Sequence, residues 1–520
     1  MNASTTSIDN AEVFLPDLWA THARFYPDKE AVICGDVRRT WGDFNLNMSR
    51  VANQLIAAGI GRGDKVAVLM TNSVDILEVM YGVVRAGACV VPLSGLLTAE
   101  QIEVLIIDSD AIAVFCAADY RDRIETIRGA LGNVRDDGFI AHGFDGEGWL
   151  GFDDFIAGAP DDKPDVSYDL TDDFNIIYSS GTTGLPKGIV QTHRARQHWS
   201  FSNAVEMRFH GNCKALTTTA LYSNGTWLMV LPALFAGATV VVLPEFSAQG
   251  FLETVQRERI THTFMVPTQF IVTLADPAFD DYDLSSIETL LCAGSPLRPD
   301  TKAEVLERLS PNLYDLYGFS EGFATMNKPH MHALKPDSVG TPVLGFDFRI
   351  VDDDGNEMPT GQAGEIAGYG AGMMKEYYKR DEATRAIILP MPDGRTYLRS
   401  GDIGKVDEDG FLYILDRKKD MIISGGFNIF PADIEAIVGE NSEVSDVTVI
   451  GVPHEKWGES PLALVIPNNG ADADGILAWS NERLAKHQRL IGVEFRDEFP
   501  RNALGKVLKR ILREPYEGGG

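Results

Sequence analysis

Helix-like and strand-like patterns alternate along the first part of this chain of 520 residues, and this alternation restricts the fold more than any other feature. Apolar residues recur at helical spacing in Trp41–Gly59 and Ile76–Ala86. Lys65–Met70 and Gly87–Leu93 are short apolar segments with the length of strands. Strands that alternate with helices are typical of parallel βαβ units, so we expect an α/β fold.

The pattern continues and then changes twice along the chain. Five more buried strands are expected at Ala111–Cys116, Phe174–Tyr178, Ala238–Leu243, Thr263–Val266 and Thr289–Cys292. After Gly340, strands joined by short polar turns predict a β-rich subdomain that ends near Asp416. Two helices and two strands after Met421 predict a separate small unit. We therefore expect a large N-terminal domain of βαβ-type sheets plus the β-rich subdomain (1–416), hinged to a small, mobile α+β C-terminal domain (417–520).

Composition excludes several classes of protein. The chain carries 46 Lys and Arg against 75 Asp and Glu, a formal net charge of −29, which disfavours binding to nucleic acid or anionic lipid. No apolar run reaches the ~18 residues of a membrane-spanning helix. The first residues lack the pattern of a signal peptide, and the five cysteines form no CxxC pair. We expect a cytoplasmic protein with no nucleic-acid partner and no integral membrane segment; the oligomeric state stays open, with a homodimer as one arrangement.

The segment Tyr178–Gly188, YSSGTTGLPKG, has the composition of a phosphate-binding loop. It follows an apolar strand, and its glycines allow the backbone to approach a ligand closely. Backbone N–H groups and hydroxyls can surround phosphate oxygens, while Lys187 adds a positive charge. The candidate binding residues are Ser179, Ser180, Gly181, Thr182, Thr183 and Gly184. This is not a Walker A loop, because Gly188 follows Lys187 instead of preceding it.

The loop sequence resembles the signature of the adenylate-forming superfamily, which includes acyl- and aryl-CoA synthetases, firefly luciferase and the adenylation domains of peptide synthetases. The resemblance extends in order from about Leu18 to Arg513. It implies that ATP and a carboxylic acid form an acyl-adenylate, whose acyl group then passes to coenzyme A. Further matching segments are AGSP (293–296), YGFSE (317–321), YLRSGD (397–402), SGGFNI (424–429) and PRNALGK (500–506).

The resemblance implies roles for residues around the nucleotide. Glu321 would bind Mg²⁺, since a carboxylate beside a triphosphate needs a bridging cation. Ser320 would hydrogen-bond the α-phosphate, and Asp402 with Arg417 would hold the ribose. The remaining residues implied in nucleotide binding, mostly around adenine, are Gly294, Ser295, Asp315, Tyr317 and Gly318.

The resemblance also implies a mobile C-terminal domain that serves both steps. Lys506 would bridge the substrate carboxylate and the α-phosphate during adenylation. After rotation about a hinge at Lys419, Gly425 and Gly426 would line the path of coenzyme A. Trp457 and Arg489 are candidate contacts for the coenzyme A nucleotide.

The acyl substrate is restricted less tightly than the nucleotide. Candidate walls of the acyl pocket are Tyr222, Asn224, Trp227, Phe319 and Phe323, which favour an aromatic, alicyclic or medium-chain acid. An amino-acid adenylation domain is disfavoured, because the stretch LYSNG (221–225) lacks the acid that binds a substrate amine. Two alternatives stay open: delivery of the acyl group to a carrier protein, and a non-catalytic nucleotide-binding protein. Retention of Lys187, Glu321, Asp402 and Lys506 argues against the second.

Overall fold

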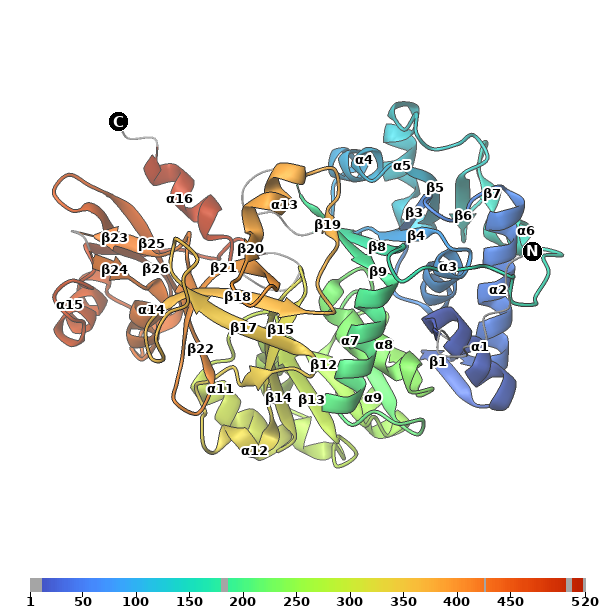
Figure 1. Cartoon of the computed structure of the whole chain (residues 1–520). Coiled ribbons are helices and arrows are strands. Elements are labelled where there is room, and N and C mark those ends of the chain that lie inside the picture. The colour runs from blue at the N-terminus through green and yellow to red at the C-terminus, as the bar shows by residue number, and fades with distance from the viewer. Residues whose placement is uncertain (1–11, 179–185, 425–426, 502–506, 518–520) are drawn as a thin grey trace.

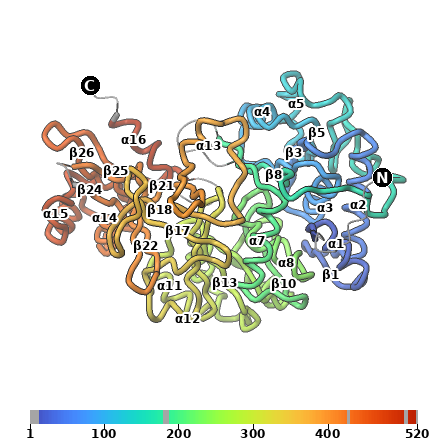
Figure 2. The backbone as a smooth tube through the Cα atoms, in the orientation of Figure 1, coloured from blue at the N-terminus to red at the C-terminus, as the bar shows by residue number. Residues whose placement is uncertain are grey.

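A computed structural model describes residues 12–178, 186–424, 427–501 and 507–517 (Figure 1). It confirms the α/β class, with a large N-terminal domain and a small C-terminal domain. Within these residues, the large domain contains three sheets, and the small domain contains a fourth. Figure 2 shows the chain running from the large domain to the small one, with α1 (Leu15–Phe25) and α16 (Lys509–Glu517) on opposite sides of the molecule.

The first sheet has nine strands in the order β16-β15-β14-β13-β12-β10-β11-β1-β2. Its centre is parallel as expected, whereas β2, β15 and β16 are antiparallel additions at the edges. The bounds are β1 Glu30–Cys34, β2 Val37–Thr40, β10 Lys214–Thr217, β11 Thr239–Val242, β12 His262–Met265, β13 Thr289–Ala293, β14 Leu313–Phe319, β15 Phe323–Asn327 and β16 Thr341–Pro342.

The second sheet has eight strands in the order β19-β9-β8-β4-β3-β5-β6-β7. Its neighbouring pairs are parallel except for β8–β9 and β9–β19, and the predicted phosphate loop lies in sequence between the antiparallel strands β8 and β9. The bounds are β3 Lys65–Leu69, β4 Cys89–Pro92, β5 Ala111–Ala117, β6 Phe139–His142, β7 Leu150–Gly151, β8 Asp173–Tyr178, β9 Gly188–Thr192 and β19 Glu376–Tyr377.

Helices form three layers around these two sheets. In β11, Val240 faces the central core shared by both sheets, and the next residue, Val241, faces a separate outer core, as strand alternation requires. The central layer contains α1 Leu15–Phe25, α2 Trp41–Ala57, α3 Val74–Arg85, α6 Phe152–Ile156, α7 His193–Glu206 and α8 Asn224–Phe235. Outside the first sheet lie α9 Ala248–Glu258, α10 Pro267–Leu274 and α11 Pro299–Glu304; outside the second lie α4 Ala99–Asp108 and α5 Arg121–Ile127.

Side-chain caps begin two of the central helices. The hydroxyl of Ser73 accepts a hydrogen bond from the N–H of Ile76 at the start of α3. Thr192 does the same for Ala195 at the start of α7. Such caps satisfy backbone donors that the first helical turn leaves unpaired.

The predicted β-rich subdomain is the third sheet, ordered β17-β18-β21-β20 with β22 paired to β21. All of its neighbouring pairs are antiparallel. Its strands are β17 Phe346–Val351, β18 Gly364–Gly370, β20 Ile388–Pro390, β21 Thr396–Val406 and β22 Leu412–Arg417, with α12 Pro329–His332 and α13 Asp381–Ile387 nearby in sequence.

The fourth sheet belongs to the small domain and has the order β24-β23-β26-β25, with β27 paired to β26. It has its own apolar core, which includes Ile434 of α14 and Ile476 of α15. The elements are β23 Ile422–Ser424, β24 Phe427–Ile429, α14 Pro431–Gly439, β25 Val444–His454, β26 Gly458–Pro467, α15 Ala473–Arg483, β27 Gly492–Phe495 and α16 Lys509–Glu517.

Candidate active site

Several of the described site residues gather where the first three sheets meet, around the β14–β15 hairpin. Tyr317 lies in β14, and Glu321 lies in the turn that follows. Side-chain hydrogen bonds join Tyr317 to Asp402 of β21 and Glu321 to Tyr377 of β19. One hairpin therefore contacts both the second and the third sheet through polar groups.

Nine predicted residues lie outside the described part of the chain: Ser179, Ser180, Gly181, Thr182, Thr183, Gly184, Gly425, Gly426 and Lys506. Their roles stay predictions. Lys187 is described, and its half-buried side chain directly precedes β9.

Tyr317, Asp402 and Arg417 form a connected group, which includes the two residues predicted at the ribose, Asp402 and Arg417. The hydroxyl of Tyr317 donates to Oδ2 of Asp402 at 2.8 Å, and Nε of Arg417 lies 3.1 Å from Oδ1 of the same carboxylate. Asp402 and Arg417 face each other in the β21–β22 register, and Asp402 is only 6% exposed. Burial, with a further contribution from Asp402, raises the pKa of Tyr317 well above its usual value, so its hydroxyl stays a proton donor.

Tyr377 connects Glu321 to Lys187, and the sequence did not identify it. Its hydroxyl donates to Oε1 of Glu321 at 2.5 Å, and the Lys187 ammonium lies 4.7 Å from the centre of its ring. Burial and the neighbouring Glu321 raise the pKa of Tyr377. The available signal was weak, because Tyr377 lies in a two-residue strand within a polar segment.

A glycine fixes the turn that carries Glu321. Gly322 has φ +120°, and a Cβ there would come within 2.3 Å of the Met373 Cα. The Glu321 carbonyl accepts a hydrogen bond from the N–H of Met374, and the Ser320 carbonyl accepts one from the Gln191 side chain. These contacts attach the turn to the edge of the second sheet.

The residues predicted around adenine follow the carboxyl end of β13 or lie in β14. Gly294 directly follows β13 and has φ +98°, and Ser295 comes next. Asp315 has a partner that the sequence did not suggest: Lys302 of α11, at 3.3 Å. Burial raises the pKa of Asp315, and Lys302 partly offsets this effect. Gly318 lies in β14 between Tyr317 and Phe319.

The predicted acyl-pocket residues fall into two groups. Asn224 and Trp227 lie on α8, where both contact Arg196 of α7. Phe319 and Phe323 lie on the hairpin with ring centres 5.8 Å apart. The α7 helix connects the groups, since Trp199 of the same helix packs on Phe346, which packs on Phe323. Tyr222 is half-buried just before α8.

The predicted hinge and coenzyme A contacts lie in or beside the small domain. Lys419 is exposed after β22, and Arg513 of α16 donates to the backbone carbonyls of Lys419 and Asp420. Gly458 pairs with Ser424, so exposed Trp457 lies beside the end of β23. Arg489 is exposed and precedes β27. Because β27 runs parallel to β26, Arg489 lies near the start of β26, where Trp457 also lies.

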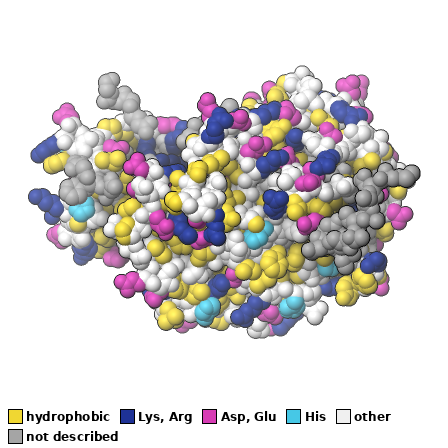
Figure 3. Space-filling model, in the orientation of Figure 1, with side chains coloured by type: hydrophobic (Ala, Val, Ile, Leu, Met, Phe, Trp, Pro, Cys, Tyr) yellow, Lys and Arg dark blue, Asp and Glu magenta, His cyan; other side chains and the backbone are white. Residues whose placement is uncertain are grey.

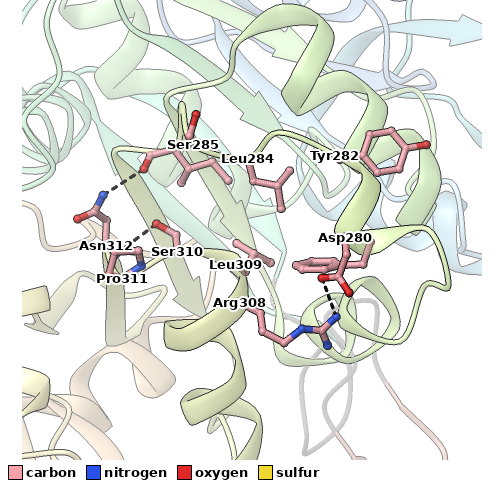
Figure 4. Close-up of a pocket in the computed structure, with 11 residues that line it drawn as sticks. Asp280, Tyr282, Leu284, Ser285, Arg308, Leu309, Ser310, Pro311 and Asn312 are labelled. Atoms are coloured by element: carbon pink, nitrogen blue, oxygen red, sulfur yellow. Dashed lines mark hydrogen bonds and ion pairs between the residues drawn. The ribbon is translucent and has the colours of Figure 1, made fainter.

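A surface pocket of about 410 Å³ lies elsewhere in the large domain (Figure 4). It is lined by residues preceding β13 and β14, including Ile287 and Asn312. The nucleotide residues lie at the opposite, carboxyl ends of these strands, where open α/β sheets bind ligands. Arg308 in the pocket is paired with Glu304 and Asp280. This pocket is therefore separate from the predicted site.

On the face seen in Figure 3, Lys and Arg side chains are interspersed with Asp and Glu. Within the described ranges, no cluster of three or more His, Cys, Asp or Glu side chains could hold a metal ion by itself. Among the helices of the same ranges, none has the length and apolar character required to cross a bilayer.

Comparison with known proteins identifies the family of this chain. Residues 19–378 match the AMP-binding enzyme family, and residues 433–506 match the AMP-binding enzyme C-terminal domain. The chain is 34% identical to a feruloyl-CoA synthase of an Amycolatopsis species, over 95% of this chain and 97% of that protein. It is 33% identical to an indoleacetate–CoA ligase of Aromatoleum aromaticum, over 95% and 96% of the two chains. ATP-bound MatB from Rhodopseudomonas palustris superposes with a TM-score of 0.86 at 28% identity, over 97% of this chain and 99% of that one.

The matched domains and the shared fold make this protein an adenylate-forming enzyme, which confirms the predicted superfamily. The chain belongs to the AMP-binding enzyme family.

Proposed function

We propose that this protein is an AMP-forming ligase that joins a carboxylic acid to coenzyme A through an acyl-adenylate. The class of reaction is confirmed by the relatives, which are CoA ligases and match this chain over nearly their whole length. The observation that carries the proposal is the convergence of Lys187, Glu321 and Asp402, from three sheets, on the β14–β15 hairpin.

In the first half-reaction, a carboxylate oxygen of the acid attacks the α-phosphorus of ATP, and pyrophosphate leaves. Lys187 would neutralise phosphate charge from its position over Tyr377. Lys506 would bridge the attacking carboxylate and the α-phosphate, since a positioned cation stabilises charge that develops in the transition state. Asp402 would accept hydrogen bonds from the ribose hydroxyls, while Tyr317 and Arg417 hold its carboxylate in place.

The residues present fit a magnesium ion. Among the described residues, Glu321 has a tyrosine hydroxyl as its side-chain partner and forms no ion pair, so its negative charge is available to a cation. Mg²⁺ is commonly held by one or two carboxylates together with substrate phosphates. When bound, it would neutralise phosphate charge beside Glu321.

In the second half-reaction, the thiolate of coenzyme A attacks the acyl carbonyl and AMP leaves. We propose that the domain after Lys419 rotates between the steps, so that Lys506 is replaced by Gly425 and Gly426. Trp457 and Arg489 share one end of β26, which is consistent with a common contact to the coenzyme A nucleotide.

We further propose an aromatic, alicyclic or medium-chain acid as substrate. The relatives named for feruloyl and indoleacetate groups favour a ring-bearing acid. A cytoplasmic location agrees with five cysteines that are all free thiols.

The test is pyrophosphate release from ATP and Mg²⁺ with a panel of carboxylic acids, with and without coenzyme A. We expect acid-dependent release, with repeated turnover and an acyl-CoA product only when coenzyme A is present. Turnover only with a phosphopantetheinylated carrier protein would favour the alternative acceptor. Release of ADP, or no dependence on any acid, would exclude the proposal.

A further inference from the structure

Arg196 is a buried cation beside the predicted acyl site. It lies on α7 and is 3% exposed. Its Nε donates to Oδ1 of Asn175 at 2.6 Å, and Nη2 donates to Oδ1 of Asn224 at 2.8 Å. The guanidinium also lies 4.8 Å from the ring centre of Trp227. Two of these three partners, Asn224 and Trp227, are predicted walls of the acyl pocket.

The charge of Arg196 is not neutralised within the described residues. Both of its hydrogen-bond acceptors are neutral amides, and it forms no ion pair there. Burial lowers its pKa to about 9, so the group still carries its charge at neutral pH. A buried charge without a counter-charge is costly, and such a charge is normally paired.

Arg196 and its neighbours carry hydrogen-bonding groups that are not in use. Nη1 of Arg196 has no hydrogen-bond partner among the described residues. Nδ2 of Asn175 and the hydroxyl of Tyr81 are buried and also unpartnered within them. The ring of Tyr81 lies 6.1 Å from that of Trp227. Guanidinium, amide N–H and phenol groups can all donate, so together they suit an acceptor oxygen.

We propose that Arg196 is a specificity-determining residue that binds an acceptor oxygen at the end of the acyl substrate remote from its reactive carboxylate. The inference rests on the proposed function and narrows the substrate class to carboxylic acids with a second carboxylate or a carbonyl group at that end. Asn224 and Trp227 hold the guanidinium so that its third nitrogen stays available. A bound anion supplies the missing counter-charge.

The experiment compares matched acids that differ only at the remote end. One series is 3-phenylpropanoic acid with a 4-carboxylate, 4-acetyl or 4-ethyl group; the other is linear acids of equal length ending in a carboxylate, ketone or methyl group. The readout is the ratio of kcat/KM between oxygen-ended and alkyl-ended members. We expect the wild type to prefer the oxygen-ended acid by about 10- to 100-fold, since sites built to hydrogen-bond a substrate discriminate strongly.

Two variants test the residue by different routes. Arg196→Met removes the cation and is expected to abolish or reverse the preference. Asn224→Asp keeps the guanidinium of Arg196 but gives it a carboxylate partner, so this variant should selectively lose activity with the dicarboxylate. It tests the proposal even if Arg196→Met does not fold. Arg194→Met is the matched control, because Arg194 is exposed on the same helix, and its ratio should equal that of the wild type.

The possible failures are distinguishable. Two results would overturn the role of Arg196 and leave the ligase activity intact. One is that the wild type prefers the alkyl-ended acid in both series; the other is that both variants keep the wild-type ratio of kcat/KM. Absence of pyrophosphate release with every acid overturns the proposed function itself.

Discussion

The hydroxyl group of Tyr377 donates a hydrogen bond of 2.5 Å to the carboxylate of Glu321, and the same ring lies against the ammonium group of Lys187. One aromatic residue thus sets the spacing between the predicted metal-binding carboxylate and the lysine of the phosphate loop. Such prior positioning lowers the reorganisation needed when charge develops in a reaction.

Replacing Tyr377 with phenylalanine should weaken the use of Mg²⁺. The ring over which Lys187 lies would remain, but the hydrogen bond to Glu321 would be lost. We expect kcat/KM for ATP to fall about 10- to 100-fold, because a hydrogen bond to a charged group is worth about 1.5–3 kcal/mol. The Mg²⁺ concentration for half-maximal pyrophosphate release should rise. Tyr378→Phe is the control, because Tyr378 bonds to Asp110 instead; equal Mg²⁺ dependence of both variants would contradict the role.

Asp402→Asn should reduce recognition of the ribose. The substitution preserves shape but removes the charge that Tyr317 and Arg417 hold in place. We expect KM for ATP to rise about 10- to 100-fold, since hydrogen bonds to charged groups are worth about 1.5–3 kcal/mol. Discrimination between ATP and 2′-deoxy-ATP should largely disappear. Asp409→Asn, at an exposed position, is the reference variant. If Asp402→Asn discriminates between ATP and 2′-deoxy-ATP as the wild type does, the ribose assignment is wrong.

Lys506 and Gly426 should affect different half-reactions. Lys506→Ala is expected to slow pyrophosphate release about 10²–10³-fold, by analogy with loss of one preorganised donor, yet spare thioester formation from supplied acyl-adenylate. Gly426→Leu should do the reverse. Arg510→Ala, which removes an exposed pair with Glu514, serves as control. Equal loss of both half-reactions in each variant would argue against domain alternation.

Acidification should destabilise the fold through buried histidines, among them His193 and His262. Burial lowers the pKa of His193 and of His262 to about 4 from 6.5. Between these values the unfolded chain binds more protons, so the free energy of unfolding should fall as pH drops from 6.5 toward 4, and be fully retained above 6.5. Each histidine should contribute about 1 kcal/mol per pH unit.

Urea unfolding at several pH values checks this expectation. His262→Gln should reduce the slope of unfolding free energy against pH, and His330→Gln should not, because His330 is exposed. An identical slope in all three proteins would show that the burial of His262 does not control its protonation.

Much of the architecture could be predicted because its signals are local. The β13 strand was expected at Thr289–Cys292 and spans Thr289–Ala293, since a short apolar run in a parallel sheet is buried on both faces. In contrast, β19 has two residues and no apolar pattern. Arg196 was also missed, because its helix, HRARQHWSFSNAVE, is polar enough to suggest an exposed face. Burial of a cation depends on what packs against it.

The reactive groups and their order along the chain can be read from the amino-acid sequence, because glycine-rich loops and buried strands are encoded by neighbouring residues. Which of these groups meet depends on how the sheets pack. Tyr317 and Asp402 are 85 positions apart, and Tyr377 and Glu321 are 56 apart. Their contacts arise from the way one hairpin packs against two other sheets. A hydrogen bond requires a separation of about 3 Å, and for residues this distant in sequence only the packing of whole sheets sets that separation.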